Sequence, residues 1–245
     1  MPLHPMRHWQ LPDAHNIRDL GGYAGAGGVA TGWGRLLRGD DLWHLSEGSR
    51  RALVDRGLAL VIDLRGLHEI AHQPNPFAAH ATVLYRNIAL FDRLEPIGTL
   101  PAPLNMAARY CEALDRCGAR LADVLAAIAE APEGIVLFHC TAGKDRTGIV
   151  AALLLLAAGV TEDEIAADYV LTAELGQAML ERLRERALAR GADPAQVSLM
   201  LASDEITIRT MLAHLRERHG GIAAYLAAIG LSPARIERLR ARLND

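Results

Sequence analysis

The sequence is short of several residue types that mark common protein classes. Only one of its 26 basic residues is a lysine, Lys144, and the formal net charge at pH 7 is −3. A charge so close to neutral gives no electrostatic case for binding nucleic acid. The three cysteines are odd in number and widely spaced, so they do not make a disulfide framework. We therefore expect neither a nucleic-acid-binding protein nor a disulfide-stapled one.

Long apolar runs are also lacking. The longest, residues 149–160, would span only ~18 Å as a helix, against ~30 Å of membrane hydrocarbon. The N-terminal stretch MPLHPMRHWQLPD has no continuous apolar segment of the kind found in signal peptides. We expect no integral membrane association and a cytoplasmic location, although secretion without a cleaved signal peptide stays open.

What is present favours a single α/β domain over residues 1–245. At 51% hydrophobic content the chain is long enough for one sizeable core. Short apolar runs predict strands at residues 36–38, 58–64, 83–90 and 135–138, and helical patterns lie between them. This alternation predicts a central mixed or parallel sheet flanked by helices. Residues 1–35 form an N-terminal arm, and residues 161–245 form a helical C-terminal part.

The most informative stretch is residues 134–159, GIVLFHCTAGKDRTGIVAALLLLAAG. It reads as a buried strand, a tight loop and a buried helix. A thiol, Cys140, begins the loop, and a guanidinium, Arg146, ends it. Backbone N–H groups at the opening of a helix favour bound anions, so this loop is predicted to wrap a phosphoryl group.

Each residue type in this loop suits phosphoryl chemistry. Cations and a helix N-terminus favour the reactive thiolate form of a cysteine, so Cys140 is the candidate nucleophile. Arg146 presents a planar fork of donors that matches two phosphoryl oxygens. His139 is expected to orient the loop. The remaining predicted substrate-binding residues are Thr141, Ala142, Gly143, Lys144 and Thr147. The Thr147 hydroxyl is also expected to donate a hydrogen bond to the Cys140 sulfur.

The loop HCTAGKDRTG resembles the signature of the cysteine-dependent protein tyrosine phosphatases, in a branch with mycobacterial and Listeria members. Residues 16–23, NIRDLGGY, are similar to an N-terminal segment of that branch. Residues 62–65, IDLR, followed by Glu69, are similar to a second segment. The resemblance implies a phosphotyrosine phosphatase-like fold and a possible lid within residues 161–245. It also implies that Lys144 suits a second phosphate or an inositol head group.

Supporting residues and the general acid are assigned from position and charge. Asp63 is expected to anchor a strand end beneath the loop, and Arg18 to buttress the loop. A carboxylate beside a bound dianion is repelled, which favours its protonated, proton-donating form. On this argument Asp145 is favoured as the general acid over Asp92, which follows the strand at residues 83–90.

The predicted function is hydrolysis of phosphate monoesters through a phosphocysteine intermediate, with no cofactor and no metal. The substrate is a phosphorylated protein, carrying phosphotyrosine or phosphoserine/threonine, or a phosphoinositide. The alternative from another class is a noncatalytic module that binds phosphoinositides or phosphoproteins.

Three other motifs fit the sequence less well. Residues 68–72, HEIAH, match the H-E-x-x-H signature of zinc proteases, but Pro74 and Pro76 leave little room for the helix it needs. A Walker loop requires a glycine where Phe138 stands and a serine or threonine where Asp145 stands. A rhodanese-type loop has one residue fewer before its arginine.

Overall fold

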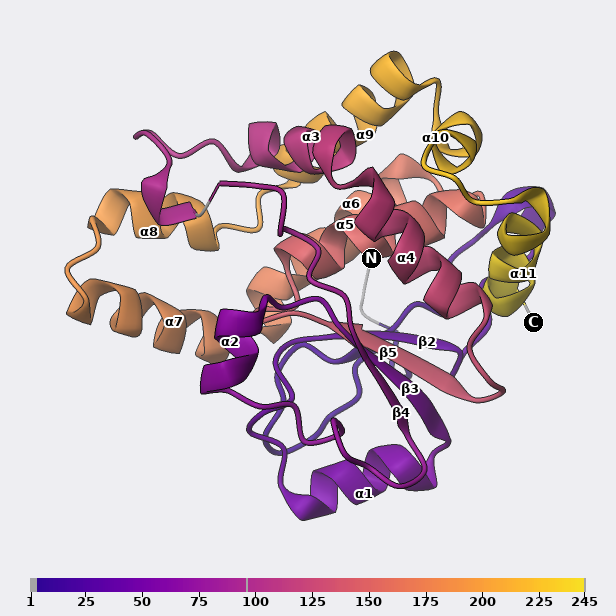
Figure 1. Cartoon of the computed structure of the whole chain (residues 1–245), viewed down its shortest axis with the longest axis horizontal. Coiled ribbons are helices and arrows are strands. Elements are labelled where there is room, and N and C mark those ends of the chain that lie inside the picture. Colours follow the sequence, from indigo (N-terminus) through magenta and orange to yellow (C-terminus); the bar gives the residue numbers. More distant parts are fainter. Residues whose placement is uncertain (1–3, 96, 245) are drawn as a thin grey trace.

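The computed structural model describes residues 4–95 and 97–244. Its sheet has the strand order β1-β2-β5-β3-β4. The strands are β1 (Arg18–Asp19), β2 (Leu36–Gly39), β3 (Leu58–Asp63), β4 (Leu84–Asn87) and β5 (Ile135–His139). Figure 1 shows this twisted sheet below a thick layer of helices.

The sheet brings the ends of its central strands to one point. β5 pairs in parallel with β2 on one side and with β3 on the other, whereas β1 runs antiparallel at the edge. In this register His139 lies opposite both Gly39 and Asp63. The carboxyl ends of three parallel strands therefore meet where β5 passes into the loop that begins with Cys140.

Helices cover the two faces of the sheet unequally. They are α1 (Glu47–Asp55), α2 (Leu67–His72), α3 (Met106–Arg116), α4 (Gly118–Ala129), α5 (Asp145–Ala157), α6 (Glu162–Leu175), α7 (Gln177–Ala189), α8 (Pro194–Leu201), α9 (Glu205–His219), α10 (Ile222–Ala228) and α11 (Pro233–Asn244). Because side chains alternate along a strand, Val136 and Phe138 face the large core under α4 and α5. Leu137 faces the smaller core beside α1. Figure 1 shows α1 alone on its side of the sheet.

The α/β class and all four predicted strands are confirmed, with ends that differ by at most three residues. The N-terminal arm contributes one strand, β1, that the sequence analysis did not separate from irregular structure. Helix α8 was missed, although Asp193 caps it and Pro194 opens it, a typical start signal. No helix among the described residues is long and apolar enough to cross a membrane.

Candidate active site

The predicted loop runs from the end of β5 to Asp145, the first residue of α5. Cys140 lies at its start and is only 2% exposed. Gly143 adopts a left-handed φ of 65°, and a Cβ there would lie 2.6 Å from the carbonyl oxygen of Gly39. Since L side chains avoid this conformation and no space is left for one, the loop requires glycine at this position.

The carbonyl groups of the loop are held on its outer side. Asn16 donates its Nδ2 to the carbonyl oxygen of Ala142 at 2.9 Å, and Arg38 donates Nη2 to that of Gly143 at 2.8 Å. In a trans peptide the N–H points opposite to the preceding C=O. The N–H groups of Gly143 and Lys144 are therefore directed to the inner side of the loop, where an anion is expected.

A buried ionic cluster fixes these loop partners. The Asp168 carboxylate of α6 accepts hydrogen bonds from Nε of Arg18 at 2.9 Å and from Nη1 of Arg38 at short distance. It also accepts one from the Tyr23 hydroxyl at 3.0 Å. Burial alone would raise the pKa of Asp168, but the two guanidinium groups hold it well below its usual range. Arg18 also donates to the side-chain oxygen of Asn16. Arg18, predicted as a buttress, thus reaches the loop only through its neighbours.

His139 and Asp63 lie under the start of the loop. His139 places Nε2 2.8 Å from Nδ2 of Asn75 and 3.5 Å from the Asp63 carboxylate, while its Nδ1 lies 3.1 Å from the carbonyl oxygen of Cys140. Asp63 is fully buried, and His139 and Arg65 outweigh the effect of burial to hold its pKa well below the usual range. The structure thus places His139 against the Cys140 backbone and Asp63 next to His139.

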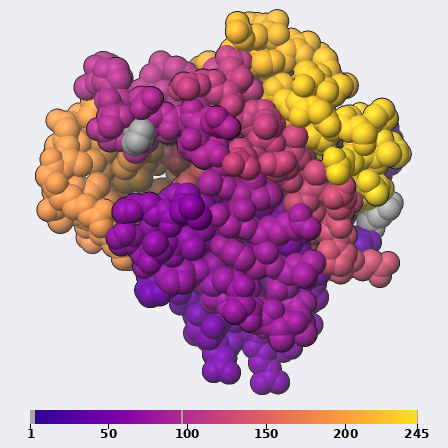
Figure 2. Space-filling view, viewed as in Figure 1, coloured from indigo at the N-terminus to yellow at the C-terminus, as the bar shows by residue number. Residues whose placement is uncertain are grey.

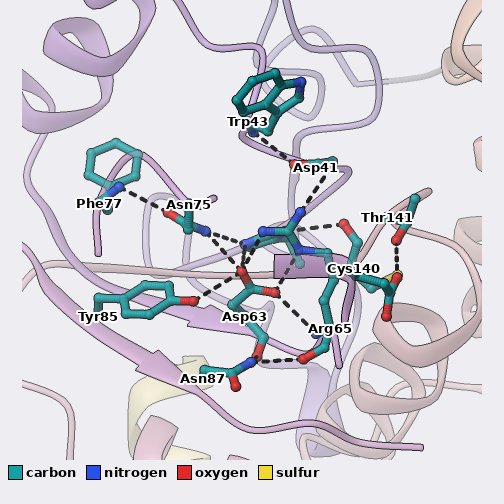
Figure 3. Close-up of polar contacts among 12 residues, drawn as sticks. Asp41, Trp43, Asp63, Arg65, Asn75, Phe77, Tyr85, Asn87, Cys140 and Thr141 are labelled. Carbon is teal, nitrogen blue, oxygen red and sulfur yellow. Dashed lines mark hydrogen bonds and ion pairs between the residues drawn. The ribbon is translucent and has the colours of Figure 1, made fainter. Parts of the chain in front are cut away.

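Arg65 carries this support on to the next residue of the loop. Its guanidinium bonds Asp63 through Nε at 2.9 Å and Nη2 at 2.7 Å, and reaches Asp41 through Nη1 at 3.0 Å. Figure 3 shows Arg65 between these two carboxylates. The backbone N–H of Asp41 in turn donates to the carbonyl oxygen of Thr141 at 3.1 Å. The floor of the loop is therefore supported from β3 as well as from β2.

Arg146 is paired with Glu69, which the sequence analysis did not predict as a site residue. Its two terminal nitrogens meet the two carboxylate oxygens at 2.5 and 2.8 Å, and the Thr141 hydroxyl donates to the same carboxylate at 2.5 Å. Burial alone would raise the pKa of Glu69, but its bonds with Arg146 and Thr141 lower it to about 2. Burial alone would lower the pKa of Arg146, but Glu69 and the charge of nearby Cys140 raise it.

The Glu69–Arg146 pair also argues against a zinc-protease function for residues 68–72. Glu69 is its glutamate, and both oxygens are bonded to Arg146, so neither is free to activate water. His68 and His72 lie on α2 with ring centroids 4.4 Å apart, and His72 places Nδ1 2.9 Å from the carbonyl oxygen of His68. In place of metal chemistry, α2 supplies a counter-ion to the arginine of the loop.

Asp145 sits in the first turn of α5 against a buried tyrosine pair. The Tyr110 hydroxyl donates to its Oδ1 at 2.6 Å and lies 2.9 Å from the Tyr169 hydroxyl. Lys144 approaches the same oxygen at 3.2 Å. Burial is the main cause, and the Asp145 charge the second, of a raised pKa in both tyrosines. Both hydroxyls therefore stay neutral and can donate. Tyr110 therefore orients the favoured acid.

Asp92, the rival acid, is placed differently. Its Oδ2 accepts from Nε of Arg120 at 2.9 Å. It lines a cavity of about 990 Å³ that Arg146 and Glu69 also line and that extends along α4. Cys140 does not line this cavity. Asp92 thus lines the same cavity as Arg146, but its carboxylate is paired with Arg120.

Lys144 is not placed to bind a second phosphate or an inositol head group, contrary to what the resemblance implied. Its side chain is 1% exposed, and Nζ donates to the carbonyl oxygens of Met200, in a short bond, and of Ala202, at 2.8 Å. The ammonium therefore faces the end of α8 and is not an exposed charge at the pocket rim. The bonds tie the catalytic loop to the α7–α8 pair, and Figure 2 shows the surface hollowed between that pair and α2.

Thr147 also differs from expectation. It is fully buried, and its Oγ1 has no hydrogen-bond partner among the described residues. The predicted bond to the Cys140 sulfur is therefore not formed in this structure. Ala142 is also buried, so its side chain forms packing and only its backbone is placed to bind.

A buried thiol, an arginine six residues further on and a loop whose N–H groups turn inward define a cysteine-phosphatase type of site. The chain matches the tyrosine phosphatase family over residues 9–245 and belongs to this family. A tyrosine-protein phosphatase of Nostoc commune is 35% identical, over 86% of this chain and 74% of that protein. The triple specificity protein phosphatase PtpB of Mycobacterium tuberculosis is 30% identical, over 94% and 97%. A crystal structure of TpbA from P. aeruginosa has a TM-score of 0.38 and 16% identity, over 80% and 97%.

Family membership supports catalysis and not the noncatalytic module. Sequence reasoning missed Arg38 and Tyr110 as parts of the site because each is distant in sequence from the loop. A charged residue inside the predicted strand at 36–38 was a signal, since a buried arginine needs a partner. Glu69 was noted within a motif, but its contact with Arg146 depends on the tertiary fold.

Proposed function

We propose that the chain hydrolyses phosphate monoesters on phosphorylated proteins, phosphotyrosine first among them, through a phosphocysteine intermediate. Its family makes it a phosphatase. The observation that carries the proposed mechanism is the loop itself, with Cys140 at its base, Arg146 at its end and N–H groups turned inward by Asn16 and Arg38. Hydrogen-bond donors preorganised in this way stabilise the charge of a transferring phosphoryl group.

In the first step the Cys140 thiolate attacks phosphorus. A sulfur–phosphorus bond forms as the phosphorus–oxygen bond to the leaving group breaks, and Asp145 gives its proton to the departing oxygen. Arg146 binds two of the remaining phosphoryl oxygens through its two terminal nitrogens. In this structure the same nitrogens donate to the Glu69 carboxylate, which the phosphoryl group would replace. The Thr147 hydroxyl, buried at the loop, is a donor for the sulfur or for a phosphoryl oxygen.

In the second step water hydrolyses the intermediate. Asp145, now a carboxylate, accepts a proton as the water oxygen bonds to phosphorus and the sulfur–phosphorus bond breaks. The products are inorganic phosphate and the regenerated thiolate. Tyr110 holds one Asp145 oxygen at 2.6 Å through both steps, which leaves the carboxyl group a fixed direction for proton transfer.

The position of Lys144 favours a protein substrate. Its ammonium is buried against backbone carbonyls, so it supplies no exposed charge for an inositol head group in this conformation. The relative PtpB is named for triple specificity, which makes phosphoserine/threonine peptides and phosphoinositides the necessary comparison substrates. We also propose α7 and α8 as a lid, because Lys144 connects them to the catalytic loop.

A cytoplasmic location is part of this proposal. All three cysteines are free thiols, which suits a reducing compartment. Cell fractionation with an antibody against the chain would test it, and recovery mainly from the medium would contradict it.

The test compares Cys140→Ser with Cys111→Ser, a free and partly exposed cysteine outside the loop. Cys140→Ser should lower turnover of a phosphotyrosine peptide by at least about 10⁴-fold while it retains binding, because only the nucleophile is lost. Acid-quenched wild-type enzyme should carry phosphate on Cys140. Turnover of Cys140→Ser within a few-fold of wild type would contradict the mechanism. Faster turnover of phosphoinositide vesicles than of the peptide would contradict the substrate assignment alone.

A further inference from the structure

A second cluster of chemically reactive side chains lies where the ends of α3 and α9 meet. One oxygen of Asp115, Oδ1, lies 2.9 Å from Nε2 of His214 and 2.8 Å from Nε2 of His219. One ligand atom from each of the three residues lies within 4.8 Å of the others. None of the three takes part in the catalytic loop or in the networks that support it.

We propose that Asp115, His214 and His219 form a binding site for a divalent metal ion of the zinc type. Two imidazole nitrogens and one carboxylate oxygen are a common ligand set for this ion. Ligand bonds of about 2.0–2.2 Å in tetrahedral geometry place neighbouring ligand atoms roughly 3.3 Å apart. The observed 2.8 and 2.9 Å separations reach that value if the side chains part by about half an ångström. This assignment departs from the expectation that the protein uses no metal.

The imidazoles are held in position before any ion arrives. The His219 ring packs edge-on against Tyr225, a buried tyrosine of α10, with centroids 5.0 Å apart, and lies 5.5 Å from the His214 ring. Fixed ligand rings lower the ordering cost of binding. Side-chain exposure of 20–30% leaves room for water as a fourth ligand. The ion would join α3 to α9.

One group opposes the ion. Arg218 places Nε 3.4 Å from the same Asp115 oxygen, and a guanidinium repels a metal cation. Its side chain is 66% exposed, so it can move into solvent when the ion binds. Arg218→Gln should therefore tighten metal binding. If the histidine–carboxylate contacts are purely structural, no variant should bind metal.

The experiment uses the full chain without an affinity tag, in a Cys140→Ser background that removes the loop thiol as a rival ligand. Calorimetric titration with Zn²⁺ should show one site per chain, and Zn²⁺ should raise the melting temperature. Even residues that only hydrogen-bond to metal ligands typically change affinity by about 10- to 100-fold. Asp115→Asn and His214→Gln should therefore each weaken binding by at least about tenfold.

His72→Gln is the matched control, because His68 and His72 form the other close histidine pair and are exposed. It should bind Zn²⁺ like the background protein. Melting temperatures without metal show whether each variant is folded. Absence of a saturable single site, unchanged binding in both Asp115→Asn and His214→Gln, or loss of binding in His72→Gln would each overturn the proposal.

Discussion

The catalytic loop is held on two sides by contacts of very different kinds. On the β2 side, Arg18, Arg38 and Asp168 are each 2% exposed or less, and Arg38 donates a hydrogen bond to the loop carbonyl of Gly143. On the other side, the α7–α8 pair reaches the loop through Lys144, and α7 buries only Met179. The first side resembles a protein core, whereas the second is a surface layer with few buried side chains.

This difference separates two requirements of the site. A loop that stabilises a phosphoryl group needs donors whose positions do not change, and buried, fully paired groups supply that rigidity. Access for substrate needs a part of the structure that opens at low cost, and regions with few buried contacts open most easily. Disruption of the rigid side should therefore have a larger effect than disruption of the weakly held side.

The largest effect is expected from Asp168→Asn, which leaves two buried guanidinium groups without their carboxylate. Breaking a buried ion pair by removing one partner typically destabilises by about 3–5 kcal/mol. Urea unfolding measures this change. Asp163→Asn on the same helix is the control, because Asp163 is 85% exposed in its pair with Arg209 and should cost less than about 1 kcal/mol. Equal losses in the two variants would mean that the cluster contributes no special rigidity.

The next effect concerns the general acid. Asp145→Asn should lower hydrolysis of phosphate esters with poor leaving groups by about 100-fold or more, and that of an activated aryl phosphate far less. The reason is that only a poor leaving group needs a proton as the bond breaks. Asp92→Asn is the control and should show no such dependence, since Asp92 is paired with Arg120. A leaving-group effect confined to Asp92→Asn would show that the acid is assigned to the wrong residue.

The comparison of the two sides also shows what the sequence can predict. The loop from Cys140 to Arg146 was predictable because its residues are adjacent and their chemistry depends on spacing. So was β5, a run of buried apolar residues. The partners Arg38, Glu69 and Tyr110 were not, because their roles arise from the sheet register and helix packing, which join residues far apart in sequence. The burial of Lys144 was unpredictable for the same reason, since its carbonyl partners belong to a helix that the sequence analysis missed.

Glu69→Gln tests the counter-ion on the open side of the loop. The pKa of Glu69 is lowered from 4.5 to about 2 in the fold, so its contribution to stability is present above pH 4.5 and is lost as the pH falls toward about 2. Between pH 6 and pH 3 the wild type should lose about 1.5 kcal/mol more than Glu69→Gln, after allowance for solvent screening. Urea midpoints at both pH values measure this difference. Parallel losses in the two proteins would contradict it, and Glu217→Gln, at an exposed pair with Arg216, is the control.

The smallest effect is expected at the Lys144 bonds between the loop and the α7–α8 pair. Lys144→Met removes the two bonds to the carbonyl oxygens of Met200 and Ala202, and the 3.2 Å contact with Asp145, but keeps the length of the side chain. Amide hydrogen exchange in α8 should become about fivefold faster, because opening this surface pair then breaks fewer bonds. Arg182→Met is the control, since its contact with His15 is exposed and its loss should change exchange in α8 by less than about twofold. If exchange in α8 is unchanged while exchange at the start of α5 rises, Lys144 supports the catalytic loop alone and the α7–α8 pair is held by other contacts.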